Sequence, residues 1–205
     1  MTEDGRLLRM SHHYDGNRHG WYITYREDAY PKEARFFLHD EDHGVRVSYH
    51  HDHVPWEPTI VNFYKFGLKH GPYSFLYEDT STIYLQEMWI EQCKVGEAAS
   101  YSKDGFIRWY DTFDDQGDQI KTRWGFWENC RACEEVPYVK GKRKGRGGHF
   151  HEDTGTPSIT RFWDDDLLQG RSKFITEEGK VFLVHIHKDN RTLDVVDKGG
   201  EEIIL

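Results

Sequence analysis

Two cysteines and two histidines have a spacing that could hold a metal ion. Cys130 and Cys133 form a Cys-x2-Cys pair, and His149 and His151 form a His-x-His pair after it. Thiolate and imidazole are the ligands that tetrahedral zinc prefers, and a Cys-x2-Cys turn can place two sulfur atoms on one ion. The chain has no second Cys-x2-Cys pair. Zinc is therefore the one cofactor that the sequence suggests, against the simpler interpretation of two incidental cysteines beside an edge loop.

A second histidine pattern comes later in the chain. His185 and His187 lie in an apolar run that predicts a strand, so both imidazoles would lie on one face of it. His149 and His151 would do the same on their own strand. If the four histidines met in one cleft, they could form a metal or phosphate site and make the chain a metal-dependent hydrolase or phosphoesterase. The alternative is that they are surface-facing strand histidines.

The segment 140–148 is rich in glycine and in basic residues, among them Lys142, Arg143 and Lys144. This composition predicts a mobile loop, which could dock on an acidic partner or on a phosphate backbone. The whole chain has 27 basic and 36 acidic residues and a net charge of −9. Because this charge repels nucleic acid over most of the surface, a nucleic-acid partner is not expected.

Motifs for covalent catalysis are missing from the sequence. It contains no Gly-x-Ser-x-Gly nucleophile motif and no phosphate-binding glycine loop. The three cysteines and the acidic start, Met1 to Gly5, indicate a reducing compartment and no signal or transit peptide. No run approaches the roughly 18 apolar residues of a membrane span. These features predict a cytoplasmic protein with no membrane span.

A degenerate repeat organises the elements that would position these residues. The pattern Gly-x4-Tyr-x2-Asp begins at Gly20, Gly44, Gly71 and Gly96, with Leu76 in place of the third Tyr, and glycine-to-glycine steps of 24, 27 and 25. Apolar and polar residues alternate within each unit, which predicts two short strands joined by a turn. A fixed period of this length is typical of stacked supersecondary units.

The repeat predicts an all-β protein, a repeat-built antiparallel meander that forms a curved, largely single-layer sheet. Glycine takes positive φ freely, so the repeated Gly is expected to close the turn. The Tyr residues at 25, 49 and 101 are expected to stack in an aromatic ladder across neighbouring units. The pattern blurs after Asp104. The chain is therefore divided into a β-repeat region, 1–113, and a part, 114–205, that is either a degenerate β-repeat or a C-terminal β region with a basic glycine-rich loop at 140–148.

The repeat resembles the MORN family, and more specifically the divergent, antitoxin-like MORN variants of bacteria and their phages. The residues that carry the resemblance are His19-Gly20 with Tyr25, His43-Gly44 with Tyr49, Lys69-His70-Gly71 with Phe75, and Lys94-Val95-Gly96 with Tyr101 followed by Lys103-Asp104-Gly105. The match covers about residues 5–113 and part of 163–187, and the doubled Gly-x-Gly of the family is missing. The resemblance implies a single-layer, curved sheet used for scaffolding, partner binding or membrane-edge association.

Together these observations predict a non-enzymatic protein-binding module, such as an adaptor, antitoxin or inhibitor of bacterial or phage origin. A single layer cannot bury both faces, so aromatic side chains would remain available to a partner; the alternative is that they form the core. The residues expected to grip the partner are Tyr25, Tyr49, Tyr101, Trp89 and Trp109, with Lys142, Arg143 and Lys144. Open repeat sheets leave edges, so the closing strand, 202–205, could also pair with a second copy.

Overall fold

The computed structural model describes residues 7–49, 57–78, 80, 82–197 and 202–203. Within these residues the protein is all-β and contains no helix, which confirms the predicted antiparallel meander and its curved sheet. The chain divides into two compact units, Met1–Gly105 and Phe106–Leu205. Because the described residues contain no helix at all, none of them forms a helix able to span a membrane.

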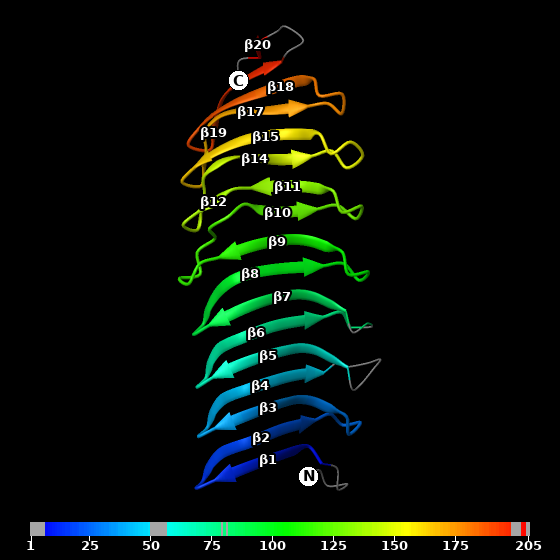
Figure 1. Cartoon of the computed structure of the whole chain (residues 1–205), viewed down its shortest axis with the longest axis vertical. Coiled ribbons are helices and arrows are strands. Elements are labelled where there is room, and N and C mark those ends of the chain that lie inside the picture. Colours follow the sequence, from blue (N-terminus) through cyan, green and yellow to red (C-terminus); the bar gives the residue numbers. More distant parts are fainter. Residues whose placement is uncertain (1–6, 50–56, 79, 81, 198–201, 204–205) are drawn as a thin grey trace. The chain divides into compact units, whose positions relative to one another are not determined.

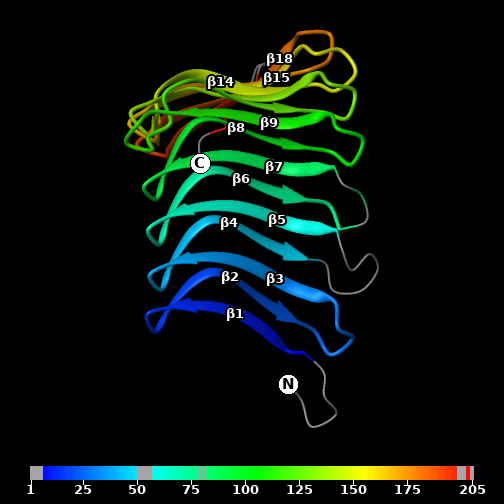
Figure 2. The ribbon, with the colours of Figure 1, turned by 60° about the horizontal axis from the view of Figure 1, so that its bottom comes forward.

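Unit 1 is a meander of hairpins in which each strand pairs with the next one in sequence (Figure 1). Its strands are β1 (Arg9–Tyr14), β2 (Asn17–Tyr25), β3 (Pro31–Leu38), β4 (Glu41–Tyr49), β5 (Pro58–Lys65), β6 (Leu68–Leu76), β7 (Ile83–Ile90) and β8 (Cys93–Tyr101). Figure 2 shows that these strands bow in the same direction. Within unit 1 the described residues form one layer, so no second layer of this unit covers either face of the sheet.

Four two-residue turns close the hairpins of unit 1. They are Asp15-Gly16, His39-Asp40, Phe66-Gly67 and Glu91-Gln92, and every residue in them has positive φ. This is the turn whose twist matches a right-handed β-hairpin, and Gly, Asn and Asp adopt it most easily. Phe66, Glu91 and Gln92 adopt it at a steric cost, so strand pairing on both sides must hold these turns in place.

The repeated glycine lies in the strand after the turn, not in the turn itself. Gly71 has φ +108 and stands in a bulge, because Asn62 pairs with Tyr73 while Tyr64 already pairs with Lys69. Three residues of β6 thus face one residue of β5, which bends the strand and increases its twist. A Cβ atom on Gly71 would lie 3.1 Å from the Cβ atom of Phe63. The expectation that this glycine closes the turn is wrong; its function is to form the bulge.

Unit 2 repeats the hairpin plan. Its strands are β9 (Ile107–Phe113), β10 (Arg123–Phe126), β11 (Ala132–Val136), β12 (Tyr138–Val139), β13 (Lys142–Arg143), β14 (Gly145–Phe150), β15 (Pro157–Asp164), β16 (Leu167–Leu168), β17 (Gly170–Ile175), β18 (Val181–Lys188), β19 (Arg191–Asp197) and β20 (Glu202–Ile203). Lys140-Gly141, Asp165-Asp166 and Asp189-Asn190 form the same positive-φ turns as in unit 1. Hairpins therefore continue past Asp104, where the sequence pattern is lost.

A backbone ladder joins the turn of each hairpin to the one before it. In unit 1 the N–H groups of Asp40, Gly67 and Gln92 donate to the carbonyls of Arg18, Asp42 and Lys69 at 2.8–3.1 Å. In unit 2 those of Gly141, Asp166 and Asn190 donate to Gln119, Arg143 and Leu168 at 2.9–3.2 Å. Each donor is the second turn residue and each acceptor stands two residues after the previous turn. This regularity places equivalent side chains at fixed positions along the sheet.

Candidate binding sites

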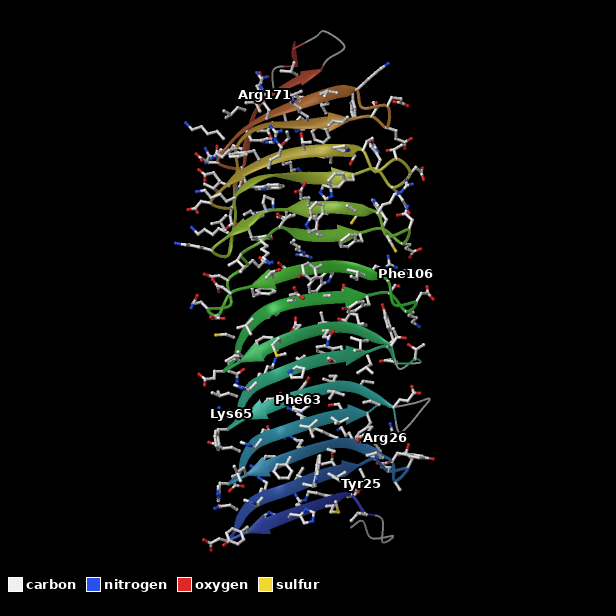
Figure 3. All side chains as sticks on the ribbon, in the orientation of Figure 1. Tyr25, Arg26, Phe63, Lys65, Phe106 and Arg171 are labelled. Atoms are coloured by element: carbon white, nitrogen blue, oxygen red, sulfur yellow. The ribbon has the colours of Figure 1, made fainter. Side chains whose placement is uncertain are left out.

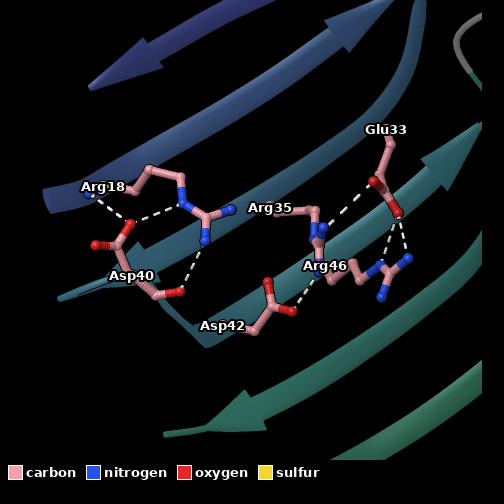
Figure 4. A network of polar contacts seen from close by, with 6 residues as sticks. All are labelled: Arg18, Glu33, Arg35, Asp40, Asp42 and Arg46. Carbon is pink, nitrogen blue, oxygen red and sulfur yellow. Dashed lines mark hydrogen bonds and ion pairs between the residues drawn. The ribbon is translucent and has the colours of Figure 1, made fainter. Parts of the chain in front are cut away.

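One face of unit 1 carries a network of ion pairs, which we call the charged face (Figure 4). Arg35 bonds the carboxylate of Asp42 through Nη2, and its Nε lies 3.9 Å from Oε2 of Glu33. Nε of Arg46 donates to Oε1 of Glu33 at 2.7 Å, so Glu33 links two guanidinium groups. The Arg35 and Asp42 side chains are 24% and 16% exposed. The charges of this half-buried cluster are thus compensated within the sheet.

Basic side chains cover the aromatic residues of the charged face. The Arg18 guanidinium lies 4.1 Å from the centre of the Phe37 ring, and Phe37 is 2% exposed. The Lys69 and Lys94 ammonium groups lie 4.5 and 5.8 Å from the centre of the Trp89 ring. A cation above an aromatic ring is attracted by the quadrupole of the ring. These contacts occupy the ring faces that a partner would need.

An Arg–Asp clamp joins successive hairpins in both units. The backbone N–H and Nε of Arg18 donate to Oδ1 of Asp40 at 3.0 and 2.9 Å, and Nη2 donates to the Asp40 carbonyl at 3.1 Å. Arg143 makes the same three bonds to Asp166, at 2.9, 3.3 and 3.1 Å. The side-chain bond from Arg18 lowers the pKa of Asp40, and the backbone N–H of Arg143 lowers the pKa of Asp166. Both carboxyl groups therefore stay ionised at neutral pH.

The opposite face of unit 1, which we call the apolar face, is lined by aliphatic and aromatic side chains. Ile23, Ala34, Val47 and Val61 follow one another across paired strands, and Trp21, Phe36, Val45, Phe63 and Met88 form the neighbouring row. Trp21 packs edge-on against Phe36 with ring centres 5.7 Å apart. Trp21 and Met88 are 38% and 40% exposed. Phe63 is labelled in Figure 3. No second layer of unit 1 covers this face within the described residues.

The three tyrosines predicted to form a ladder stand at equivalent strand ends. Tyr25, Tyr49 and Tyr101 are the last residues of β2, β4 and β8, and each is half-buried. Another strand lies between β2 and β4, so their ends are two strand spacings apart, about 10 Å, which is too far for rings to stack. The predicted ladder is therefore wrong. Tyr25 instead lines an open hollow of about 520 Å³ with Leu8 and Lys32.

The two predicted partner-binding tryptophans belong to the framework of the sheet. Trp89 pairs with Gly71 across the strands, and its Nε1 donates to Glu87 at 3.0 Å. Trp109 pairs with Gly125, and the Arg123 guanidinium lies 5.5 Å from its ring centre. Both are half-buried. In each case the tryptophan pairs with a glycine on the neighbouring strand, and a cation lies near its ring.

Residues 140–148 do not form one mobile loop. Lys140-Gly141 is a two-residue turn between β12 and β13, and β14 begins at Gly145. The three basic residues pair with the three acidic residues of the next turn: Lys142 with Asp165 at 2.9 Å, Arg143 with Asp166 at 3.3 Å and Lys144 with Asp164 at 3.1 Å. The bond to Asp165 raises the pKa of Lys142. These contacts replace the predicted docking finger with cross-hairpin ion pairs.

The structure does not bring the cysteine and histidine pairs together. No group of three His, Cys, Asp or Glu side chains within the described ranges could hold a metal ion. Cys130 is an exposed turn residue with φ +63, while burial, and then the charge of Glu134, raises the pKa of the Cys133 thiol. His149 lies 3.8 Å from Glu134, and Nε2 of His151 is 2.8 Å from the Ile175 carbonyl oxygen. The two pairs thus have separate contacts.

Unit 2 contains a hollow of about 220 Å³, whose walls include Arg161, Trp163, Leu168, Ser172, His185 and His187. Ser172 pairs with His185 across β17 and β18, which places both on one face. Ser172 is 2% exposed and His187 is 8% exposed. Neither the Ser172 hydroxyl nor Nε2 of His187 has a hydrogen-bond partner in the described structure. Burial, then the charges of His185 and Arg161, lowers the pKa of His187.

This hollow holds only one of the two predicted histidine pairs. His185 and His187 line it, with ring centres 5.8 Å apart, whereas His149 and His151 have the separate contacts given above. Arg161 and Ser172 are functional candidates that the sequence pattern missed. Alignment of the repeats on their turns would have found Arg161, because it stands four residues before Asp165 as Arg35 stands four before His39.

Comparison with known proteins adds no assignment to these sites. A scan against protein-family models gives no match to this sequence, and a search of curated proteins gives no significant match.

Proposed function

We propose that this protein is a non-enzymatic binding module of the MORN-repeat type, which holds a protein partner on the apolar face of unit 1. The supporting observation is the contrast between the two faces of one sheet. On the charged face, Arg35 and Glu33 compensate each other and Trp89 lies under two lysines. On the apolar face, Trp21 and Met88 present apolar surface with no covering layer in unit 1.

The apolar face has the properties of a protein interface. Exposed apolar patches that span several elements mark interaction surfaces in soluble proteins, and aromatic and Met side chains are enriched at interface centres. The strands that carry this row, from Trp21 on β2 to Met88 on β7, are paired in register, so the surface is preformed. An adaptor, antitoxin or inhibitor acting in the cytoplasm would use such a surface without chemistry of its own.

The partner-binding residues of this proposal differ from those chosen on sequence alone. Trp21, Phe36, Phe63 and Met88 replace Trp89 and Trp109, which the structure places beneath cations. The basic residues at 142–144 are engaged by Asp164, Asp165 and Asp166. They are therefore left out of the proposed surface.

The test is capture of a partner from host lysate with matched variants. Trp21→Glu and Met88→Glu place a charge on the apolar face, and Tyr14→Glu places the same charge on the 68% exposed ring beside the first turn. We expect one protein to be retained by the wild type and by Tyr14→Glu and lost by the other two. Retention by all four would reject the apolar face as the binding surface. Sedimentation at two concentrations identifies the outcome in which a second copy of the chain covers it.

A further inference from the structure

We propose that the hollow in unit 2 binds the phosphoryl group of a small soluble anion, with Arg161, His185 and Ser172 as its donors. The inference is independent of the proposed protein partner, since it concerns another unit. It depends on the contents of the hollow: two guanidinium groups, of which that of Arg143 is paired with Asp166, two imidazoles and a buried hydroxyl, with no carboxylate among the lining residues.

The repeat supplies an internal reference for Arg161. Counted from the turn, Arg161 occupies the position of Arg35 in unit 1, and Trp163 that of Phe37. Register agrees, because Trp163 pairs with Leu168 as Phe37 pairs with Asp42. The framework around both sites is also the same, since Arg143 clamps Asp166 as Arg18 clamps Asp40.

The two arginines differ in the residues that would neutralise them. Arg35 contacts Glu33 and Asp42. The equivalent positions around Arg161 hold Ile159 and Leu168, which carry no charge. The Arg161 side chain has no ion pair or hydrogen bond to any other described residue. A cation that is kept on a half-buried face without its counter-ions is suited to an external anion.

Side-chain size explains why unit 2 has a hollow at this place. Six residues after the turn, the first three hairpins of unit 1 have the long side chains of Tyr22, Arg46 and Tyr73, and the fourth has Ala98. The equivalent positions on the two strands beside Arg161 are Gly147 and Ser172, which pair with or adjoin β15. Loss of these large side chains leaves the space of about 220 Å³.

The donors in the hollow match the acceptors of a phosphoryl group. A guanidinium presents several N–H donors in a fixed plane, and phosphate oxygens accept them in pairs. The Ser172 hydroxyl and His187 Nε2 are buried and unpaired, which is costly unless something hydrogen-bonds them. A bound phosphoryl group would satisfy the hydroxyl and the guanidinium together, and the remaining volume would hold the group to which it is attached.

The test uses the full chain titrated with inorganic phosphate and, separately, with phenyl phosphate at constant ionic strength, followed by calorimetry. We expect saturable binding by the wild type and at least about tenfold weaker binding by Arg161→Gln, because a hydrogen bond to a charged group is lost. If phenyl phosphate binds more tightly than inorganic phosphate, the site is assigned to a phosphate monoester. If the two anions bind equally, it is assigned to free phosphate. Failure of both anions to bind overturns the proposal.

Two further variants make the result specific. Leu168→Asp restores the carboxylate that Asp42 supplies in unit 1, so it should abolish binding while leaving Arg161 in place. Arg171→Gln removes the same charge from an exposed position of β17, which pairs with Ile186 and is labelled in Figure 3, so it should bind like the wild type. Equal loss in Arg171→Gln would show general charge attraction and overturn the site. If Arg161→Gln fails to fold, the loss or retention of anion binding in Leu168→Asp still tests the proposal.

Discussion

The hairpin β3–β4 in unit 1 and the hairpin β15–β17 in unit 2 share one framework and differ in their charges. Each has a positive-φ turn, a clamped Asp and a buried aromatic ring beside the bulge. In unit 1 the central arginine, Arg35, contacts Asp42 and Glu33. In unit 2 its counterpart, Arg161, lies in a hollow without carboxylates. The backbone of this repeat therefore sets where side chains go, and a few substitutions decide whether a site is closed or open.

The buried aromatic ring tests whether the two frameworks are equivalent. Phe37→Ala and Trp163→Ala each remove a ring that is 2% or 5% exposed, so each should lower the free energy of unfolding by about 3 kcal/mol. Urea denaturation measures both. Leu193→Ala, at a side chain that is 58% exposed, is the control and should change stability by less than about 0.5 kcal/mol. A large loss of stability in only one of the two variants would show that the two hairpins do not share one framework.

The bulge glycine separates backbone strain from side-chain crowding. Gly71→Ala should cost about 2 kcal/mol, because φ is +108 and the new Cβ would lie 3.1 Å from Phe63. Gly170→Ala should cost about 1 kcal/mol, because φ is +65 and nothing lies within 4 Å. Thermal and urea unfolding of both variants give the difference. Equal losses of stability in the two variants would mean that Phe63 moves to make room for the added Cβ atom at position 71.

Removal of each arginine should have unequal effects. Arg35→Gln leaves Asp42, which is 16% exposed, without its cation and leaves Glu33 with Arg46 alone, so it should cost about 1 kcal/mol after allowance for solvent screening. Arg161→Gln removes a cation that has no carboxylate partner and should change the free energy of unfolding by less than about 0.5 kcal/mol. If Arg161→Gln lowers the free energy of unfolding by more than this, the guanidinium of Arg161 must interact with another group of the protein, and the contrast with Arg35 would fail.

The fold was predictable from the sequence because its signals are local. Alternating apolar residues, turn residues and the glycine period each specify a hairpin, and the meander follows from joining hairpins. The sequence left open whether 114–205 continues the repeat, because unit 2 keeps the spacing but not the residue types: Gly145 and Gly170 are followed five residues later by Phe150 and Ile175. The number of residues from the turn therefore identifies equivalent positions in the repeat even where the residue types differ.

The sites were harder to predict because they depend on what lies across the strands. Lys142 looks like part of a charged loop until the turn of the next hairpin places Asp165 beside it. Trp89 looks available until Lys69 and Lys94 are placed above its ring. Residues two strands apart in the sheet are about 25 residues apart in the chain. A motif search along the sequence therefore cannot identify which charged side chains pair with one another across the strands.

Removal of the Arg–Asp clamp should have the smallest effect on stability. This effect should also be the same in both hairpins. The pKa values of Asp40 and Asp166 lie below the ordinary value of 3.8 in the folded state. A lowered folded pKa contributes stability that is complete above the unfolded pKa and is lost as pH falls through the folded pKa. Stability should therefore decline with acid below about pH 4, and Asp40→Asn and Asp166→Asn should each flatten that decline by a similar, modest amount.

Urea midpoints measured between pH 2 and pH 6 for the wild type, both single variants and the double variant would test this, because that range spans the ordinary Asp pKa of 3.8. Both carboxylates are solvent-exposed, so added salt should shrink the effect in each unit alike. Unequal flattening would mean that the clamps differ in strength, although their bond lengths differ by at most a few tenths of an ångström. The difference between the hairpins would then extend to the framework, and Arg161 could no longer be compared with Arg35 on charge alone.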